Sequence, residues 1–353
     1  MSQSVQSDSP QEVPGGVTTP GKLPNPALLQ QVALAHRSSM VLFAAAELDV
    51  FTHISNGQTT ADQLAEACGA KREPLRLVLE FCVADGLLTS ADGHFANTPA
   101  TDAFLVRGRP AYGGHGLKYA EDLYPVWGGL AGLVRTGKPP IDPDTILGDD
   151  KEKTRAFVLA MHERARGLGS VLPHGADFSG RKRLLDVGGG PGTYSMALVR
   201  SIPGLNSTVL DLPGVLEVTR ELVEKNGFAD RVSLMPGNYL TTPFGTGFDA
   251  VLLSGMMHRE TADTCRMLLR KSYDALDPGG LVVVSDVYFE DDQKNSPPFA
   301  LSFALNMMLT SHEGSTHAKT EMARWLEEAG FGQITVKPLP APNPHTLISG
   351  RRS

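Results

Sequence analysis

A glycine cluster follows a short apolar run near the middle of this 353-residue chain. The order is Leu184-Leu185-Asp186-Val187 and then Gly188-Gly189-Gly190-Pro191-Gly192. An apolar run that ends at glycines is typical of a buried parallel strand, and glycines let the backbone turn tightly beside a ligand. The helix expected from Thr193 onward points its free N–H groups at the same place. This stretch therefore predicts a nucleotide-type cofactor loop.

The spacing within the cluster argues against two common nucleotide sites. The cluster lacks the Gly-x-Gly-x-x-Gly spacing of dinucleotide sites, and no Gly-Lys-Ser/Thr of a phosphate loop is present. Asp211 ends the next expected strand, where a carboxylate can accept both hydroxyls of a ribose. Sites for NAD and for S-adenosylmethionine share this acid, so it does not choose between them by itself.

Strands and helices alternate through residues 181–353, which predicts an α/β, doubly wound, mostly parallel sheet. The expected strands are Arg183–Val187, Ser207–Leu210, Val232–Met235, Phe248–Leu253, Leu281–Asp286, Gln333–Val336 and Thr346–Ser349. The expected helices are Thr193–Arg200, Val215–Asn226, Thr261–Leu276, Phe299–Leu309 and Lys319–Ala329. Ligands of such sheets bind at the carboxyl ends of the strands, where Gly188, Asp211, Asn238 and His258 all fall.

The first part of the chain is mostly helical and contains the outline of a winged helix. Residues 1–25 are rich in Ser, Gln, Gly and Pro, and we expect a disordered tail there. An apolar helix is expected over Pro26–Leu48 and should be buried, with a second subunit as one candidate partner. Helices from Thr60 and from Glu73, followed by two short strands around Ala91-Asp92-Gly93, complete the outline. Its few positive charges favour dimerisation and support over DNA binding.

The overall composition is that of an ordinary globular protein, with 41% hydrophobic and 20% charged residues. A formal net charge of −7 argues against nucleic acid or an anionic membrane as a partner. No apolar run reaches the roughly 20 residues that span a bilayer, and no signal peptide is evident. Three isolated cysteines favour a cytoplasmic protein with reduced thiols and offer no metal-ligand spacing, so no metal is expected.

The combination of motifs resembles class I S-adenosylmethionine-dependent methyltransferases. The segments that carry the resemblance are residues 186–192, Asp211-Leu212-Pro213, Gly237-Asn238-Tyr239 and Asp277-Pro278-Gly279-Gly280. With the winged-helix start, the resemblance narrows to the O-methyltransferases of plant caffeate, mammalian acetylserotonin and bacterial polyketide or antibiotic metabolism. This family implies a Rossmann-like methyltransferase sheet preceded by a mostly α winged-helix domain for homodimerisation.

The resemblance also implies a division of the chain and a cofactor. The expected parts are a disordered tail (1–25), a dimerisation domain (26–110), a helical linker with the acceptor pocket (111–180) and an S-adenosylmethionine-binding catalytic domain (181–353). The cofactor is S-adenosylmethionine, and S-adenosylhomocysteine is the product. The implied cofactor-binding residues are Asp186, Gly188, Gly190, Asp211, Leu212, Asn238, Tyr239 and Ser254.

Two of these positions depart from the family pattern. Asn238 stands where the family usually has an Asp that faces the adenine amine, and its carbonyl can still accept from that amine. Ser254 stands where plant members usually have Lys. Among the residues that match the family, Gly188 is expected at the methionine part of the cofactor and Asp211 at the ribose. Leu212 and Tyr239 are expected beside the adenine.

Methyl transfer from a sulfonium needs proximity, alignment and a deprotonated acceptor. His258 stands at the position of the family's general base, and histidine suits that role near neutral pH. Asp286 matches the acid that holds this base, although the family usually has the longer Glu. A second acid of the plant members corresponds to Ala318 and is absent, and His317 is one residue that could compensate.

The acceptor pocket is expected on two helices that flank the sheet, Lys151–Val171 and Phe299–Leu309. The matching residues are Phe157, Met161, His162, Phe303, Asn306 and Met307. Together the motifs predict methyl transfer to a hydroxyl of a small phenolic or enolic acceptor. Three alternatives stay open. The first is an S-, N- or C-methyltransferase on the same fold, and the second is a winged-helix regulator that only senses the cofactor. The third, against which His258 and Asp286 argue, is an enzyme that uses the cofactor for hydroxylation or pericyclic steps without methyl transfer.

Overall fold

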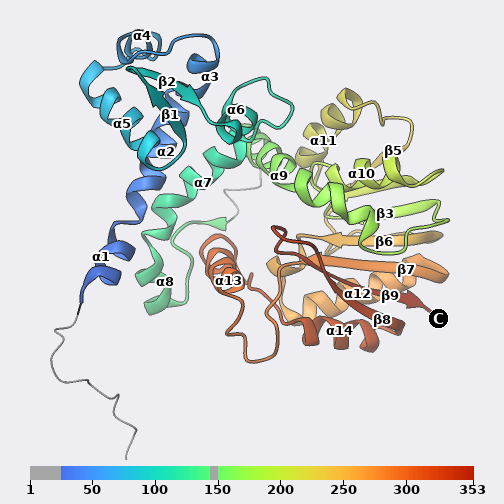
Figure 1. The fold of residues 1–353 in the computed structure, drawn as a ribbon. Coiled ribbons are helices and arrows are strands. Elements are labelled where there is room, and N and C mark those ends of the chain that lie inside the picture. The colour runs from blue at the N-terminus through green and yellow to red at the C-terminus, as the bar shows by residue number, and fades with distance from the viewer. Residues whose placement is uncertain (1–24, 144–149) are drawn as a thin grey trace, which may run out of the picture.

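The computed structural model describes residues 25–143 and 150–353, so the tail expected over residues 1–25 lies, except for Asn25, outside the described residues. A helical N-terminal part and a sheet-containing C-terminal part form the two ends of the molecule, with a group of helices between them (Figure 1). Within the described ranges, no helix is long and apolar enough to cross a membrane.

The N-terminal part consists of short helices and a two-stranded wing. Its elements are α1 (Ala27–Leu34), α2 (His36–Glu47), α3 (Val50–Ser55), α4 (Ala61–Ala67), α5 (Arg72–Ala84), β1 (Leu88–Ala91), β2 (His94–Asn97) and α6 (Pro99–Leu105). Thr60 caps α4 through a capping box. In the β1–β2 hairpin Ala91 pairs with His94, and Asp92 and Gly93 have positive φ angles of 50° and 76°. The expected order of helices and hairpin is confirmed.

Helix α1 corrects the expectation of a buried helix over Pro26–Leu48. The structure divides this stretch into α1 and α2 at Ala35, and no residue of α1 is buried. Leu29 is 73% exposed, whereas Ala45 of α2 packs into the N-terminal core. The described part of a single chain places no core against α1, and the burial expected for its apolar residues is therefore not seen within these residues.

Among the residues that the structure describes, three helices and a short 3-10 turn connect the two parts of the molecule. They are α7 (Gly114–Trp127), α8 (Leu130–Thr136), α9 (Lys151–Val171) and η2 (Leu172–His174). Helix α9 has the expected bounds because Asp150 accepts hydrogen bonds from the N–H groups of Glu152 and Lys153 in its first turn. Arg166 of α9 donates to backbone carbonyls of residues 110–112 and so ties α9 to the segment before α7.

A seven-stranded sheet of order β5-β4-β3-β6-β7-β9-β8 forms the C-terminal part. The strands are β3 (Arg183–Val187), β4 (Asn206–Asp211), β5 (Val232–Pro236), β6 (Phe248–Ser254), β7 (Leu276–Asp286), β8 (Phe331–Pro338) and β9 (Thr346–Arg352). The helices are α10 (Thr193–Ser201), α11 (Pro213–Lys225), η3 (Met257–Arg259), α12 (Ala262–Ala275), α13 (Pro298–Thr310) and α14 (Lys319–Glu328). Strands β3 to β7 run parallel, and β9 runs antiparallel between β7 and β8. The expected doubly wound, mostly parallel sheet is confirmed.

Alternate residues of the central strands pack on opposite faces of the sheet. Leu184 joins an apolar cluster with α9, α10 and α11, whereas the neighbouring Leu185 joins a cluster with α12 and α14. A strand that is covered on both faces must be apolar throughout, as Val251-Leu252-Leu253 is. Helices occupy both faces, and the strand ends are therefore the natural place for polar site residues.

Strand β7 is longer than the expected Leu281–Asp286. It begins at Leu276 and runs through residues 277–280, which the sequence indicated as a connection. Phe248 pairs with Leu276 before a register shift, and Gly279 has a φ angle of 75°. The strand therefore passes through an irregular segment before its regular pairing begins at Leu281.

Candidate active site

The glycine loop lies between β3 and α10, as expected. Gly188, Gly190 and Gly192 have φ angles of 62°, 53° and 69°, which side chains rarely allow. A Cβ atom at Gly188 would lie 3.5 Å from the ring of Tyr239 and 3.6 Å from Met256. The N–H groups of Gly188 and Gly190 already donate within the protein. At its glycines the loop therefore offers a surface without Cβ atoms, while the N–H groups of Gly188 and Gly190 are not free to donate to a ligand.

Asp186 lies beneath this loop. Its side chain is fully buried, and Oδ2 accepts a 2.6 Å hydrogen bond from the Ser195 hydroxyl. A Cβ atom at Gly189 would fall 2.7 Å from the Asp186 carboxyl carbon, so the carboxyl supports the loop from below. Burial raises the pKa of Asp186 to about 7, with the Ser195 hydrogen bond opposing the shift and Asp211 adding to it.

This raised pKa predicts a pH-dependent stability. An unfolded Asp loses its proton near pH 3.9, whereas folded Asp186 holds one up to about pH 7. The stabilisation is therefore present at low pH and is lost as the pH rises through 7. We expect the free energy of unfolding to fall by about 1 kcal/mol more between pH 6 and 8 in the wild type than in Asp186→Asn. Urea titrations of the two proteins without ligand measure this difference, and parallel curves would contradict it.

Asp211 ends β4 and joins two elements of the site. Its Oδ2 accepts from the N–H of Gly190 at 2.8 Å, and its Oδ1 accepts from the N–H of Leu212 at 2.7 Å. Burial raises the pKa of Asp211, while the two N–H groups and the charge of Arg259 oppose the shift. This carboxylate therefore holds the glycine loop to the start of α11, where Leu212 packs partly buried against the core.

The remaining expected cofactor residues lie at the ends of β5 and β6. Asn238 is exposed, and its Oδ1 accepts from the N–H of Leu240 at 2.9 Å, so this acceptor is engaged within its own turn. The Tyr239 hydroxyl donates to Glu260 Oε1 at 2.6 Å, which fixes the ring beside the glycine loop. Ser254 is buried, and its hydroxyl makes no hydrogen bond within the described residues.

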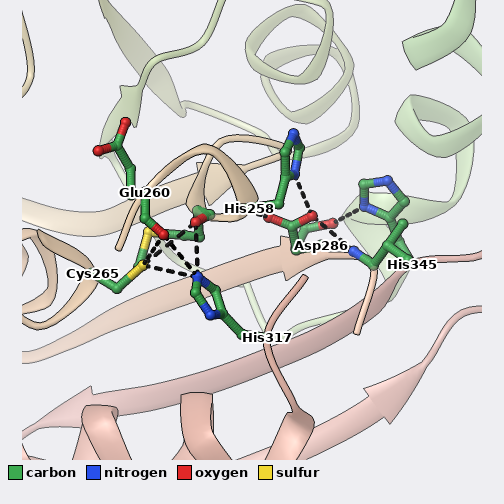
Figure 2. A network of polar contacts seen from close by, with 9 residues as sticks. His258, Glu260, Cys265, Asp286, His317 and His345 are labelled. Carbon is green, nitrogen blue, oxygen red and sulfur yellow. Dashed lines mark hydrogen bonds and ion pairs between the residues drawn. The ribbon is translucent and has the colours of Figure 1, made fainter. Parts of the chain in front are cut away.

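His258 and Asp286 lie side by side at the ends of β6 and β7 (Figure 2). His258 Nδ1 is 2.7 Å from Asp286 Oδ1, and the His258 backbone N–H donates to Asp286 Oδ2 at 3.2 Å. Because η3 brings both the ring and the backbone of His258 to the carboxylate, the short Asp reaches where the family usually has Glu.

The hydrogen bonds determine which nitrogen of His258 is free. Burial alone would raise the pKa of Asp286, but the charge and hydrogen bond of His258, helped by His345 and the Val287 N–H, lower it. An ionised carboxylate only accepts hydrogen bonds, so Nδ1 is the nitrogen that donates to it, and in the neutral ring Nε2 is the nitrogen with the lone pair. The Phe303 ring meets the imidazole edge-on, with centroids 4.8 Å apart. His258 is thus held at Nδ1, and its Nε2 has no hydrogen-bond partner within the described residues.

His317 supports the loop that carries His258 and does not contact the imidazole of His258. Its Nε2 lies 3.2 Å from the Met257 carbonyl, 3.1 Å from the Glu260 carbonyl and 3.5 Å from Cys265 Sγ. Figure 2 shows this second cluster beside the His258–Asp286 pair. Burial lowers the pKa of His317, although Asp286 and the two carbonyls oppose the shift, so the neutral ring donates from Nε2.

Replacing His317 should slow turnover without weakening cofactor binding. In His317→Ala the Met257 and Glu260 carbonyls lose their donor, at a cost of about 1–3 kcal/mol in the free energy of unfolding. The looser loop should lower kcat about 10-fold and leave the Kd for S-adenosylhomocysteine within twofold. His317→Gln, which keeps a donor, should recover part of kcat. Steady-state kinetics and calorimetry test this, and a normal kcat in His317→Ala would refute it.

Residues of α13 expected in the acceptor pocket lie near His258. Phe303 contacts His258 and is stacked on Phe299, with centroids 6.2 Å apart. Asn306 Oδ1 accepts from the Trp127 Nε1–H at 3.1 Å, which ties α13 to α7. Met307 is buried. The polar end of Asn306 is therefore engaged in holding two helices together.

Residues of α9 expected in the pocket divide into two groups. Phe157 meets the ring of Tyr119 edge-on at 5.6 Å, and the sulfur of Met161 lies 4.0 Å from the Arg164 guanidinium. His162 differs, because its Nδ1 lies 2.7 Å from the Thr193 hydroxyl at the start of α10. The structure thus brings His162 to the glycine loop.

The surroundings of Ala318 show why a second acid at this position would be unfavourable. The residue is fully buried in an apolar cluster with Val287, Phe289, Ala300 and the partly buried Phe303. A carboxylate at this position would be surrounded by hydrocarbon. His317 does not contact the imidazole of His258 in its place, and Asp286 is the carboxylate that lies 2.7 Å from His258 Nδ1.

The structure places three further polar residues near the site that the sequence analysis did not predict there. Tyr194 lies in the first turn of α10, Arg164 on α9 and His345 immediately before β9. His345 Nδ1 is 3.1 Å from the Ser285 hydroxyl, beside Asp286. Helical and strand spacing could not indicate these residues, because tertiary packing brings their elements to the end of β7.

A doubly wound sheet, a glycine loop after β3, an acid after β4 and a histidine–carboxylate pair after β6 and β7 define a class I S-adenosylmethionine-dependent methyltransferase. The chain belongs to the O-methyltransferase family: residues 141–332 match its O-methyltransferase domain, and residues 30–107 match its dimerisation domain. The match to the dimerisation domain supports a homodimer. The similarity to a methyltransferase of a small molecule supports a small-molecule acceptor. In the described ranges, no group of three or more His, Cys, Asp or Glu residues could hold a metal ion.

Two relatives are each 31% identical to this chain. One is the 3-hydroxy-5-methyl-1-naphthoate 3-O-methyltransferase of Streptomyces sahachiroi, matched over 95% of this chain and 98% of the relative. The other is the tetracenomycin polyketide synthesis 8-O-methyl transferase TcmO of Streptomyces glaucescens, matched over 93% and 97%. The fold is that of human N-acetylserotonin methyltransferase, with a TM-score of 0.84, 24% identity, and 95% of this chain and 100% of that chain covered.

Proposed function

We propose that this enzyme methylates a hydroxyl of a small phenolic or enolic acceptor, with His258 as general base and Asp286 as its support. The observation that carries the proposal is the 2.7 Å contact between His258 Nδ1 and Asp286, which leaves Nε2 free at the carboxyl end of the sheet. The names of the two relatives, which specify O-methylation of a hydroxynaphthoate and of a tetracenomycin polyketide, support a hydroxyl acceptor.

The residues at the glycine loop fit S-adenosylmethionine. The four glycines of the loop have no Cβ atoms, a fixed acid stands beside them, and two buried polar atoms, Asp186 Oδ1 and Ser254 Oγ, have no partner within the described residues. We assign Gly188, Gly190, Asp186 and Ser254 to the methionine part of the cofactor and Asp211 to its ribose. Leu212, Asn238 and Tyr239 would border the adenine. When bound, the cofactor supplies an already activated methyl group.

The residues of this chain then perform the proton chemistry. His258 Nε2 accepts the proton of the acceptor hydroxyl, and the resulting imidazolium is stabilised by the ionised Asp286 at Nδ1. Phe303 holds the ring in place. Phe157, Met161, Phe303, Asn306 and Met307 are assigned to the acceptor side, and His162 to the border between the acceptor and the glycine loop.

A panel of acceptors tests the function directly. The purified protein and S-adenosylmethionine are incubated with phenols, enols, thiols and amines of similar size, and the products are identified by mass. We expect a mass gain of one methyl on a hydroxyl oxygen, assigned by NMR. Methylation of thiols or amines alone would contradict the proposal.

N-methylation is the second candidate, because a relative that is 28% identical is named the N,N-dimethyltransferase OxyT. An amine reacts through its neutral form and needs less help from a base. A cofactor-sensing regulator is disfavoured by the net charge of −7 and the intact histidine–carboxylate pair. We propose a homodimer that works in the cytoplasm without nucleic acid or membrane as a partner, consistent with three free cysteines.

A further inference from the structure

Glu260 directly follows η3, the short helix that carries His258, and has a half-buried carboxylate. Among the residues that the structure describes, the Tyr239 hydroxyl is the one group that donates to this carboxylate, at 2.6 Å from Oε1. Figure 2 shows the carboxylate pointing away from His317, which binds only the backbone carbonyl of Glu260. The second oxygen, Oε2, is therefore available to accept hydrogen bonds from a ligand.

Tyr239 is held at both of its ends. Burial raises the pKa of its hydroxyl, and the charge and hydrogen bond of Glu260 raise it further, so the hydroxyl keeps its proton and donates. The Tyr239 carbonyl accepts from Lys271 Nζ of α12 at 2.5 Å, and the same ammonium donates to the Thr242 carbonyl at 2.9 Å. Two side chains of opposite charge thus fix the ring that lies 3.5 Å from the Cβ position of Gly188.

The segment that carries Tyr239 begins beside the acid assigned to the ribose. The Gly237 N–H donates to the Asp211 carbonyl at 2.9 Å, where β5 ends next to β4. In the cofactor the adenine is bonded directly to the ribose, so this assignment puts Tyr239 and the carboxylate on its hydroxyl toward the adenine. Asn238 is exposed there, and its Oδ1 already accepts from the Leu240 N–H. The unengaged acceptor at this place is therefore Oε2 of Glu260.

We propose that Glu260 determines the specificity of the cofactor site for adenine: Oε1 holds Tyr239 in place, and Oε2 accepts a hydrogen bond from the exocyclic amine of the base. This inference rests on the proposed function only where that function assigns Asp211 and Tyr239 to the cofactor. A carboxylate accepts and an amine donates, so the bond is charge-assisted. A purine with a carbonyl at that position, such as hypoxanthine, would face the carboxylate with a second acceptor.

The test compares two ligands that differ in the purine. Calorimetry measures the Kd of the full-length protein for S-adenosylhomocysteine and for S-inosylhomocysteine, which carries hypoxanthine. The wild type should bind the inosyl compound about 10- to 100-fold more weakly, the value of a charged hydrogen bond. Glu260→Gln keeps an acceptor for Tyr239 and offers an amide N–H in place of Oε2, so the ratio of the two Kd values should fall at least about 10-fold. Glu328→Gln is the matched control, because Glu328 pairs with Arg266 on the surface, and both Kd values should stay unchanged.

Two further variants separate recognition of the amine from support of the ring. Tyr239→Phe frees the ring and leaves the carboxylate, so both ligands should lose affinity by a similar factor. Asn238→Ala should keep the wild-type ratio of the two Kd values. An unchanged ratio in Glu260→Gln, or a ratio lost in Asn238→Ala instead, would overturn the proposal.

The measurement needs no methyl acceptor, so it is independent of whether a hydroxyl is methylated. If the wild type binds both ligands equally well, the proposal for Glu260 fails and the proposed function stands. If the wild type binds neither ligand, the assignment of the glycine loop and Asp211 to the cofactor fails, and the proposal for Glu260 fails with it.

Discussion

His258→Ala should lower kcat for a phenolic acceptor by about 10²- to 10⁴-fold, the usual contribution of a positioned base. The variant loses the Nε2 lone pair that takes the proton, whereas the glycine loop and Asp211 remain in place. The Kd for S-adenosylhomocysteine should therefore stay within about threefold of the wild type. Single-turnover kinetics with one phenol, and calorimetry with the product cofactor, measure the two quantities.

A thiol acceptor provides the internal control for this variant. A free thiol has a pKa of about 8.5 and is partly ionised near neutrality, so it needs less help from a base than a phenol with a pKa near 10. Any thiol that the enzyme accepts should lose much less rate in His258→Ala than the phenol. Near-normal phenol turnover in this variant would rule out His258 as the base and point to a softer nucleophile.

Asp211→Ala should weaken binding of S-adenosylhomocysteine at least about 100-fold. The change removes two acceptors expected for the ribose and also frees the N–H groups of Gly190 and Leu212, so the glycine loop loses its link to α11. Calorimetry measures the loss of affinity, and circular dichroism checks that the protein remains folded.

Asp249→Ala is a matched control for Asp211→Ala. Asp249 also bridges two backbone N–H groups, those of Lys182 and Arg183, but it does so at the start of β3, at the other end of the strand from the glycine loop. Removal of a structural bridge alone should therefore cost stability in both variants and affinity only in Asp211→Ala. Equal losses of affinity would show that Asp211 acts through the fold and not through the ribose.

Much of the fold could be predicted because local signals were strong. Strand Arg183–Val187 and helix Lys151–Val171 have the expected bounds, since glycines end the first and Asp150 caps the second. The exposure of α1 could not be predicted. Apolar residues at helical spacing indicate that one face of a helix will be buried, but they do not identify what the face packs against. The early start of β7 at Leu276 depends on pairing with Phe248, which is a tertiary contact.

The candidate site shows the same division. Gly188, Asp211 and His258 were placed together by one rule, that parallel strands end at one edge of a sheet. His317 and His345 act through loops whose positions follow from α14 and the antiparallel β9, which no spacing in the sequence reveals. Resemblance to a family indicated that an acid was missing at Ala318, but only packing showed that hydrocarbon fills its place.

The position of β9 has a consequence for how the enzyme is made in the cell. In the finished sheet β7 lies between β6 and β9, and Thr346 of β9 pairs with Asp286. During synthesis β7 therefore keeps an open edge until residues 346–352 have left the ribosome. The Asp286 carboxylate is enclosed by β9 only once those residues are added, so a nascent chain that already carries the glycine loop and His258 does not yet have the complete surroundings of that carboxylate.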